Sequence, residues 1–346
     1  MHFSNKLTAW YLQNRRSLPW RETKDPYAIW LSEIILQQTR VAQGLPYFEA
    51  FLHEFPTVFD LANAEEDKVM HLWQGLGYYS RARNLHATAK MVAFDYNGIF
   101  PNNSKELLKL KGVGEYTAAA IASFSYNEVI PVVDGNVFRV LARRFGINSD
   151  ISTLTTKREF QALAASLIPK DSPALFNQAI MEFGALQCTP QSPDCTICPF
   201  QLECIAYQTN EVSSLPVKLS KTKVRDRHFD YLIFLDPNGN TQIQQRTKKD
   251  IWQQLYEFPL IESTTTELID IKQQLTSLFP NLAIKQIELC NTDPIIHKLS
   301  HQKLHIRFWK IHTETALNNS SSIEELQKIG FPIVIHNFIN NNLIDL

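Results

Sequence analysis

The stretch Lys-Leu-Lys-Gly-Val-Gly-Glu-Tyr-Thr-Ala-Ala-Ala-Ile-Ala, residues 109–122, has two glycines one residue apart directly before a run of small residues. Glycine permits positive φ angles and lets the backbone approach a ligand closely. The run from Glu115 to Phe124 is predicted to be a helix, and the amides at a helix N-terminus favour an anion. The pattern therefore fits either a phosphate-binding turn or an ordinary tight connection between two helices.

The bulk composition is that of a soluble globular protein. Of 346 residues, 44% are apolar and 20% are charged, and the length suggests two domains. No apolar run is long enough to span a membrane, and the first twenty residues contain arginines and tryptophans that a signal peptide would not have. We therefore expect a cytoplasmic protein.

The formal net charge of −1 gives no electrostatic evidence for a nucleic-acid partner. A DNA-binding function would have to depend on local phosphate-binding features, such as the glycine-rich turn, rather than on bulk charge.

The apolar pattern predicts an almost entirely helical domain over residues 1–208. A helix begins at Asp25-Pro26, and apolar residues recur at helical spacing from Tyr27 to Ala42. Further helices are expected over residues 104–110, 115–124, 136–145, 157–167 and 173–183.

The residue composition and the expected secondary structure change after residue 208. Residues 209–224 are rich in Ser and Lys and are expected to form a linker. Residues 229–235 and 241–246 are predicted strands, and the Asp-Pro-Asn-Gly-Asn between them is typical of a hairpin. With a helix expected over 265–278 and a strand over 303–312, residues 225–346 form a domain of mixed α and β structure.

Four of the five cysteines, Cys188, Cys195, Cys198 and Cys204, are separated by six, two and five residues. In a reducing compartment such clustering indicates a metal site rather than disulfides. Four thiolates can bind zinc or an iron–sulfur cluster, and the spacing alone leaves both open. Cys290 stands apart and is expected in the core.

Together these motifs resemble the helix–hairpin–helix DNA glycosylases related to endonuclease III, and most closely the adenine-specific family among them. The similarity runs through residues 18–21, 30–41, 72–85, 110–118 and 133–143 and the cysteine cluster. It implies an all-α helix–hairpin–helix glycosylase domain with a [4Fe–4S] cluster on the four cysteines. It also implies a Nudix-like α+β domain at the C-terminus.

The family resemblance assigns the catalytic carboxyl groups to Glu33 and Asp134. Two carboxyl groups can divide glycosidic cleavage, one protonating the leaving base and the other stabilising the cationic sugar. For a general acid working near neutral pH, the pKa of Glu33 should be raised by about 2 units from ~4.3. The residues alone leave other roles open: a solvated glutamate for Glu33 and a helix N-cap for Asp134.

Tyr116 lies where relatives that also nick the backbone usually carry a lysine, whose amine forms a Schiff base with the sugar. A phenol cannot do this, so we expect base removal without strand cleavage. The resemblance further implies that Tyr116 and Asn136 orient groups around a covalent sugar intermediate. Direct attack by water remains an alternative.

The base must be flipped out of the duplex before any side chain can protonate it. The resemblance supplies candidate DNA contacts around the opened stack, the phosphates and the base pocket. These are Gln38, Thr39, Leu76, Tyr78, Gly112, Gly114 and Arg21, with Trp20 beside the base pocket.

The second domain is expected to recognise the lesion. The acidic helix that holds magnesium in Nudix hydrolases is missing after residues 252–262, so the second domain is not expected to be a hydrolase itself. In the family this domain senses 8-oxoguanine opposite adenine, and Ser300 and His301 match its reader loop. Leu299 departs from the usual phenylalanine there, and a polar hairpin tip is the alternative interpretation.

We therefore expect a monomeric, monofunctional glycosylase for adenine mispaired with 8-oxoguanine or, less selectively, guanine in double-stranded DNA. The alternatives are an endonuclease III-like glycosylase/lyase for oxidised pyrimidines and a non-catalytic iron–sulfur DNA-binding protein. Tyr116 disfavours the first, and the presence of both Glu33 and Asp134 disfavours the second.

Overall fold

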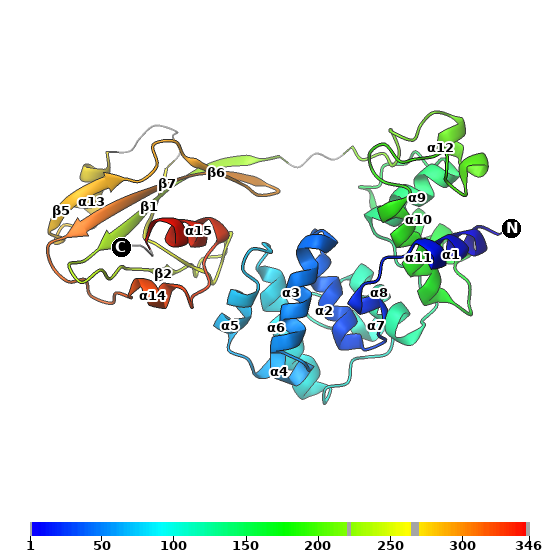
Figure 1. The fold of residues 1–346 in the computed structure, drawn as a ribbon, viewed down its shortest axis with the longest axis horizontal. Helices are drawn as coiled ribbons and strands as arrows, with labels where there is room; N and C mark the ends of the chain where they lie inside the picture. Colours follow the sequence, from blue (N-terminus) through cyan, green and yellow to red (C-terminus); the bar gives the residue numbers. More distant parts are fainter. Residues whose placement is uncertain (1, 220–222, 264–269, 344–346) are drawn as a thin grey trace. The chain divides into compact units, whose positions relative to one another are not determined.

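The computed structural model describes residues 2–219, 223–263 and 270–343 (Figure 1). The chain divides into two compact units, one formed by residues 1–63 and 84–220 and the other by residues 64–83 and 221–346. Among the described residues, no helix has the length and apolar character needed to cross a membrane.

Residues 2–208 contain helices and no strand, so the expected helical fold is confirmed. Its helices are α1 (Phe3–Asn14), η1 (Pro19–Arg21), α2 (Pro26–Leu36), α3 (Val41–Glu54), α4 (Val58–Asn63), α5 (Glu66–Leu72), α6 (Ser80–Lys90), η2 (Met91–Asp95), α7 (Ser104–Leu107), α8 (Glu115–Tyr126), α9 (Gly135–Phe145), α10 (Leu154–Leu167), α11 (Pro173–Leu186), η3 (Gln201–Glu203) and α12 (Ile205–Gln208). Helix α5 and the start of α6 belong to the second unit.

Helix α2 is apolar on every side. It begins at Pro26, where the Asp25 side chain accepts a hydrogen bond from the Tyr27 amide, as expected for an N-cap. All nine residues from Tyr27 to Ile35 are buried, Glu33 included. The helical pattern expected to reach Ala42 is instead broken at residues 37–40, where Gln38 has a φ of 57°. Glu33 is therefore not a solvated side chain.

The glycine-rich turn joins α7 to α8. Gly112 has a φ of +76°, and a Cβ at this position would lie 2.7 Å from the Asn84 Cβ, so the turn requires glycine here. Gly114 is the extended N-cap residue of α8; no side chain caps the helix, and a Cβ at Gly114 would meet nothing within 4 Å. The space in front of the α8 amides is therefore open.

The cysteine loop is anchored by Phe200, which lies between Cys198 and Cys204 in the sequence. Its ring packs 4.9 Å from Phe3 of α1 and 5.3 Å from Phe183 of α11, measured between centroids. The same core also includes Val212, Leu215 and Val217 from the expected linker. The first part of that segment is thus packed on the helical unit.

The second unit is built on a mixed sheet in the order β4-β1-β7-β5, with β6 also pairing with β7. Its strands and remaining helices are β1 (Arg225–Leu235), β2 (Gln244–Gln245), β3 (Tyr256–Glu257), β4 (Leu260–Ser263), α13 (Ile271–Leu278), β5 (Ile284–Leu289), β6 (Ile295–Lys298), β7 (Gln302–Thr313), α14 (Ile323–Leu326) and α15 (Ile333–Asn342).

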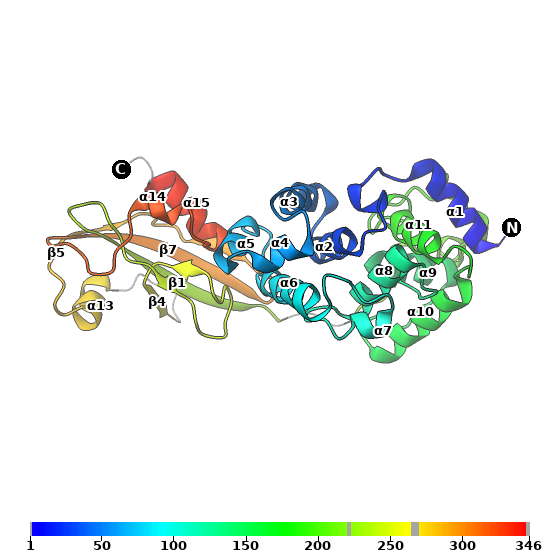
Figure 2. The same cartoon turned by 90° about the horizontal axis from the view of Figure 1, so that it is seen from below.

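Helices cover both faces of this sheet, with α13 and α15 on opposite sides (Figure 2). Ile271 and Leu275 of α13 pack against Leu232 and Phe234 of β1. On the other face, Phe338 of α15 stacks on Phe308 with the ring centroids 3.9 Å apart. The mixed α and β fold expected for this part of the chain is therefore confirmed.

The expected hairpin between residues 229–235 and 241–246 is wrong. Strand β1 pairs with β4 on one edge and with β7, in parallel, on the other. Because both edges of β1 are occupied, the chain after the Asp236–Asn240 turn pairs elsewhere, with β2 against β3. Helix α13 begins at Ile271; the earlier part of the helix expected from residue 265 lies outside the described residues.

The two glycines of the turn should respond differently to alanine. Gly112→Ala should lower the free energy of unfolding by about 1–3 kcal/mol because it strains a left-handed position and meets Asn84. Gly114→Ala should lower it by about 1 kcal/mol or less. Urea unfolding followed by circular dichroism measures both, and equal losses would contradict this account of the turn.

Candidate active site

A cavity of about 580 Å³ lies in the first unit, lined by residues of η1, α2, α8, α9 and α11. It brings together most of the residues expected around the reacting base, although they come from distant parts of the sequence. These are Trp20, Arg21, Glu33, Thr39, Tyr116, Asp134 and Asn136. Gln38, Gly112 and Gly114 are not part of its lining.

Glu33 lies on the face of α2 that forms one wall of the cavity, with only 8% of its surface exposed. Burial raises the pKa of this carboxyl to about 7. A hydrogen bond from the Tyr116 hydroxyl opposes the rise, the charge of Asp134 adds to it, and Arg21 opposes it. Near neutral pH, a substantial fraction of Glu33 thus carries a proton.

Asp134 caps α9 and lines the same cavity. One carboxylate oxygen accepts a hydrogen bond from the Val137 amide at 2.8 Å, and the other accepts one from the Asn136 side chain at 2.7 Å. Burial raises the pKa of Asp134, while these hydrogen bonds and the nearby Arg139 favour its charged form. The N-cap interpretation is correct, and it leaves the carboxylate beside the cavity.

Tyr116 is a neutral hydrogen-bond donor in this site. Burial raises its pKa well above the ordinary value, and the nearby charge of Glu33 raises it further. The phenol therefore keeps its proton and can orient the Glu33 carboxyl without acting as a nucleophile.

Arg139 was not identified from the sequence as a site residue. Its guanidinium donates to the Asn136 side-chain oxygen at 2.8 Å and to the Gly184 carbonyl at 2.7 Å. It also donates to the carbonyl of Cys188 at 2.7 Å. Arg139 thus links the Asp134–Asn136 pair to the start of the cysteine loop.

Sequence reasoning also missed two polar residues of α11 that line the cavity, Gln178 and Glu182. The buried Tyr11 hydroxyl donates to the Gln178 oxygen at 2.9 Å. Glu182 is paired with Arg16 and Arg21. A glutamate within the apolar run of residues 179–186 was a signal that could have pointed to this position.

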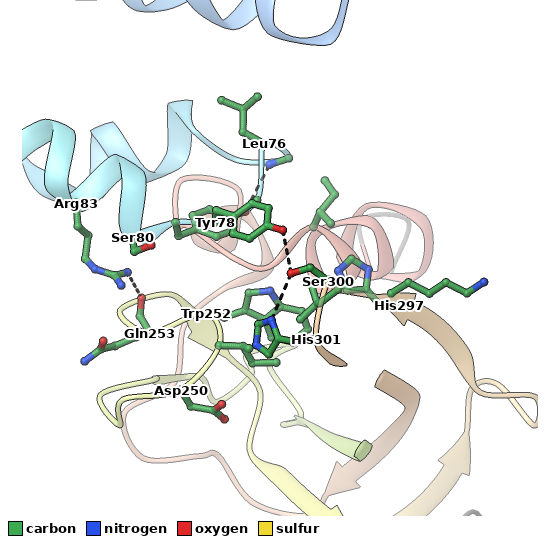
Figure 3. A pocket seen from close by; sticks show the side chains of 17 residues that line it. Leu76, Tyr78, Ser80, Arg83, Asp250, Trp252, Gln253, His297, Ser300 and His301 are labelled. Atoms are coloured by element: carbon green, nitrogen blue, oxygen red, sulfur yellow. Dashed lines mark hydrogen bonds between the residues drawn. The ribbon is translucent and has the colours of Figure 1, made fainter. Parts of the chain in front are cut away.

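A second pocket, of about 470 Å³, lies within the second unit, where it collects four further DNA-contact candidates (Figure 3). Leu76 and Tyr78 come from the loop before α6, and Ser300 and His301 from the turn before β7. The Tyr78 hydroxyl lies 3.0 Å from the Ser300 hydroxyl, which lies 3.4 Å from His301 Nδ1.

The second pocket is also lined by two aromatic side chains, Trp252 and His297, that the sequence analysis did not identify. The Trp252 ring lies 5.6 Å from the His297 ring, measured between centroids. Tyr78 has a φ of 48° and is 44% exposed. An exposed aromatic side chain on a strained turn, beside hydroxyl and imidazole groups, can stack on a base and form hydrogen bonds.

Two of the four clustered cysteines, Cys188 and Cys204, contact Arg143. Its guanidinium lies 3.5 Å from the Cys188 sulfur, and its carbonyl accepts a hydrogen bond from the Cys204 thiol. Burial raises the pKa of Cys198 to about 11. The thiols interact electrostatically with one another, yet within the described chain no three ligand side chains converge on a single-ion site.

Comparison with known families matches both units. Residues 31–166 match the HhH-GPD superfamily of base excision DNA repair proteins, and residues 230–341 match the NUDIX domain. The first unit also resembles solved structures. A thermostable thymine-DNA glycosylase has a TM-score of 0.56 at 30% identity, covering 60% of this chain and 95% of its own. An endonuclease III–DNA complex has a TM-score of 0.53 at 23% identity, and the match covers 60% of this chain and 94% of that one. At this identity the likeness shows the shared fold.

Curated relatives extend over nearly the whole chain. The adenine DNA glycosylase of Buchnera aphidicola from Baizongia pistaciae is 34% identical over 345 residues, covering 97% of this chain and 95% of the relative. The adenine DNA glycosylase of Buchnera aphidicola from Acyrthosiphon pisum is 36% identical over 306 residues, covering 88% of this chain and 85% of the relative. The human enzyme is 42% identical over 222 residues, covering 62% and 41%.

The full-length match, together with the cavity that holds two carboxyl groups, shows that the chain belongs to the adenine DNA glycosylase (MutY) family of base-excision repair enzymes.

Proposed function

We propose that the cavity receives an adenine flipped out of double-stranded DNA, where it was mispaired with 8-oxoguanine or, less selectively, with guanine. The observation that carries this proposal is a pair of carboxyl groups in one cavity of about 580 Å³: the buried Glu33, with a pKa of about 7, and the half-buried Asp134. A general acid is most effective when its pKa lies near the working pH.

In the proposed reaction the neutral Glu33 carboxyl gives its proton to N7 of adenine. The bond between the sugar C1′ and adenine N9 breaks, and its electron pair leaves with the base. Asp134, held as a carboxylate by Val137 and Asn136, stabilises the positive charge that develops on the sugar. Water then completes the hydrolysis, either directly or after a bond forms between the sugar and Asp134.

Tyr116 supports a monofunctional reaction. Its neutral phenol lies against Glu33, and no amine is placed there by this residue to form a Schiff base with the sugar. An endonuclease III-like lyase reaction on oxidised pyrimidines is therefore disfavoured.

We infer that the second pocket reads the base opposite adenine. Tyr78, Leu76, Gln38 and Thr39 would fill the gap in the opened stack, while Ser300 and His301 contact the partner base. The polar hydrogen-bonding groups beside the exposed Tyr78 ring support this assignment. Gly112 and Gly114 would place the α8 amides against a backbone phosphate.

We propose that Cys188, Cys195, Cys198 and Cys204 hold a [4Fe–4S] cluster. The four thiols of one short loop supply the all-cysteine donor set of such a cluster, and Cys188 and Cys204 both contact Arg143. When the cluster is bound, its irons would be ligated by the four thiolates, and this ligation would fix the conformation of the loop. Arg139 then holds Asn136 at a set distance from that loop through the Cys188 carbonyl.

The remaining expectations stay proposals. They are a glycosylase domain over residues 1–208, a linker over 209–224, a lesion-recognition domain over 225–346, and a monomer that acts on DNA in the cytoplasm.

Removing the proton donor should stop base release and leave DNA binding intact. Glu33→Gln should lower the single-turnover rate of adenine release by about 10²–10⁴-fold, the usual contribution of a general acid. Binding to the mispaired duplex should change little. In the native enzyme, strand scission should require alkali treatment.

The matched control is Glu49→Gln, which changes an exposed glutamate on α3 and should keep full activity. Substantial turnover by Glu33→Gln would reject the general-acid role.

The reader loop should set the preference between partner bases. Ser300→Ala with His301→Ala should reduce the rate preference for 8-oxoguanine over guanine by about thirtyfold, since each of the two lost hydrogen bonds contributes roughly 1 kcal/mol. Ser277→Ala, at an exposed position on α13, serves as the control. An unchanged preference in the double variant means that the loop does not read the partner base.

Metal analysis of the purified protein decides the cysteine site. We expect about four irons and a matching amount of acid-labile sulfide per chain, with visible absorbance from the cluster. One zinc per chain with no visible chromophore would contradict the cluster assignment.

A further inference from the structure

One wall of the cavity is a group of three charged side chains: the buried Glu182 and its two partners Arg16 and Arg21. The Glu182 side chain has no exposed surface. Its two oxygens accept hydrogen bonds from the Arg16 side chain at 2.8 and 2.6 Å and from the Arg21 side chain at 2.8 and 2.7 Å. The Arg16 backbone amide adds another at 3.0 Å.

This group carries more positive than negative charge. Two guanidinium ions surround one carboxylate, so the net charge is about +1 over the working pH range. The arginines depress the pKa of Glu182 to about 2, against the effect of burial, so this carboxylate stays charged throughout. Burying the Glu182 carboxylate is unfavourable unless its charge is paired, and its five hydrogen bonds meet that requirement.

The group acts on the catalytic acid through Arg21. Arg21 favours the charged form of Glu33, which is the form that cannot donate a proton. The other titratable residues lining the cavity are Tyr116, Asp134, Arg40 and Arg139. Of these, Tyr116 also favours ionised Glu33 and Asp134 opposes it. Glu182 accepts two hydrogen bonds from Arg21, and its negative charge therefore partly cancels the effect of the Arg21 charge on Glu33.

We propose that Glu182 is a positioning residue for base release: by holding Arg16 and Arg21 and offsetting one of their two positive charges, it keeps Glu33 protonated at the pH where the proton must be delivered. The proposal rests on the general-acid role of Glu33 given above. It assigns α11 a part in the chemistry, although Glu182 itself need not touch the base.

A series of variants that changes the charge of this wall tests the proposal. The net charge of the three residues is +1 in the native enzyme, +2 in Glu182→Gln, 0 in Arg21→Gln, and +1 again in the double variant. Single-turnover release of adenine opposite 8-oxoguanine is measured from pH 5.5 to 9, each variant being compared with its own acid plateau.

In the native enzyme the rate should fall as the pH rises through the pKa of Glu33, about 7. Glu182→Gln should move this fall to lower pH by about one unit, a roughly tenfold greater loss at pH 8 relative to its own plateau. Arg21→Gln should move it to higher pH. The double variant should return it toward the native position.

Glu182→Asp keeps the charge and shortens the side chain, so it separates charge from packing. In Glu182→Asp the rate of adenine release should fall at the same pH as in the native enzyme, even if the rate at the acid plateau is lower. The proposal is overturned if Glu182→Gln and Glu182→Asp lower the rate equally at every pH, or if the double variant does not restore the profile.

Failure of the underlying reaction would look different. If the native enzyme shows no fall near neutral pH and Glu33→Gln remains active, the general-acid assignment itself fails. If Glu33→Gln is inactive while the charge series leaves every profile unmoved, only the role of Glu182 is lost. Circular dichroism on each variant confirms that the helical unit is folded, and Arg21→Gln tests the opposite direction of shift independently.

Discussion

The proposed chemistry depends on the desolvation of one carboxyl group. Glu33 is placed on a helix that is buried on every side, and its burial raises the pKa to about 7. A helix that is apolar on almost all sides has to lie inside the protein, so the packing that folds α2 also raises the pKa of the proposed proton donor. Stability and catalytic competence are therefore coupled at this helix.

The two acids of the cavity differ because their hydrogen bonds differ. Desolvation raises the pKa of each, but Asp134 accepts hydrogen bonds from Val137 and Asn136 that favour its charged form. Glu33 has a single hydroxyl donor, Tyr116. A capping position at the start of α9 thus supplies the anion, and a mid-helix position supplies the acid. Environment rather than residue type divides the two roles.

Patterns local in sequence were predictable from the sequence, and features set by distant contacts were not. The helices of the first unit and the glycine turn follow from spacing and composition. The raised pKa of Glu33 was expected only from the family resemblance, since the residues alone also allowed a solvated glutamate. The hairpin failed because the edges of β1 are taken by β4 and β7, which lie far along the chain. The Glu182 wall was missed for the same reason, since its partners are more than 160 residues away.

That wall shows why the remote residues matter. Positive charge near the cavity suits a phosphate-rich ligand, yet any positive charge near Glu33 favours loss of the proton that the reaction needs. Glu182 allows both conditions to hold, because it pairs the arginines inside the protein and limits their effect on the acid. A protein with a net charge near zero can then combine local phosphate-binding turns with a neutral, proton-bearing carboxyl in one domain.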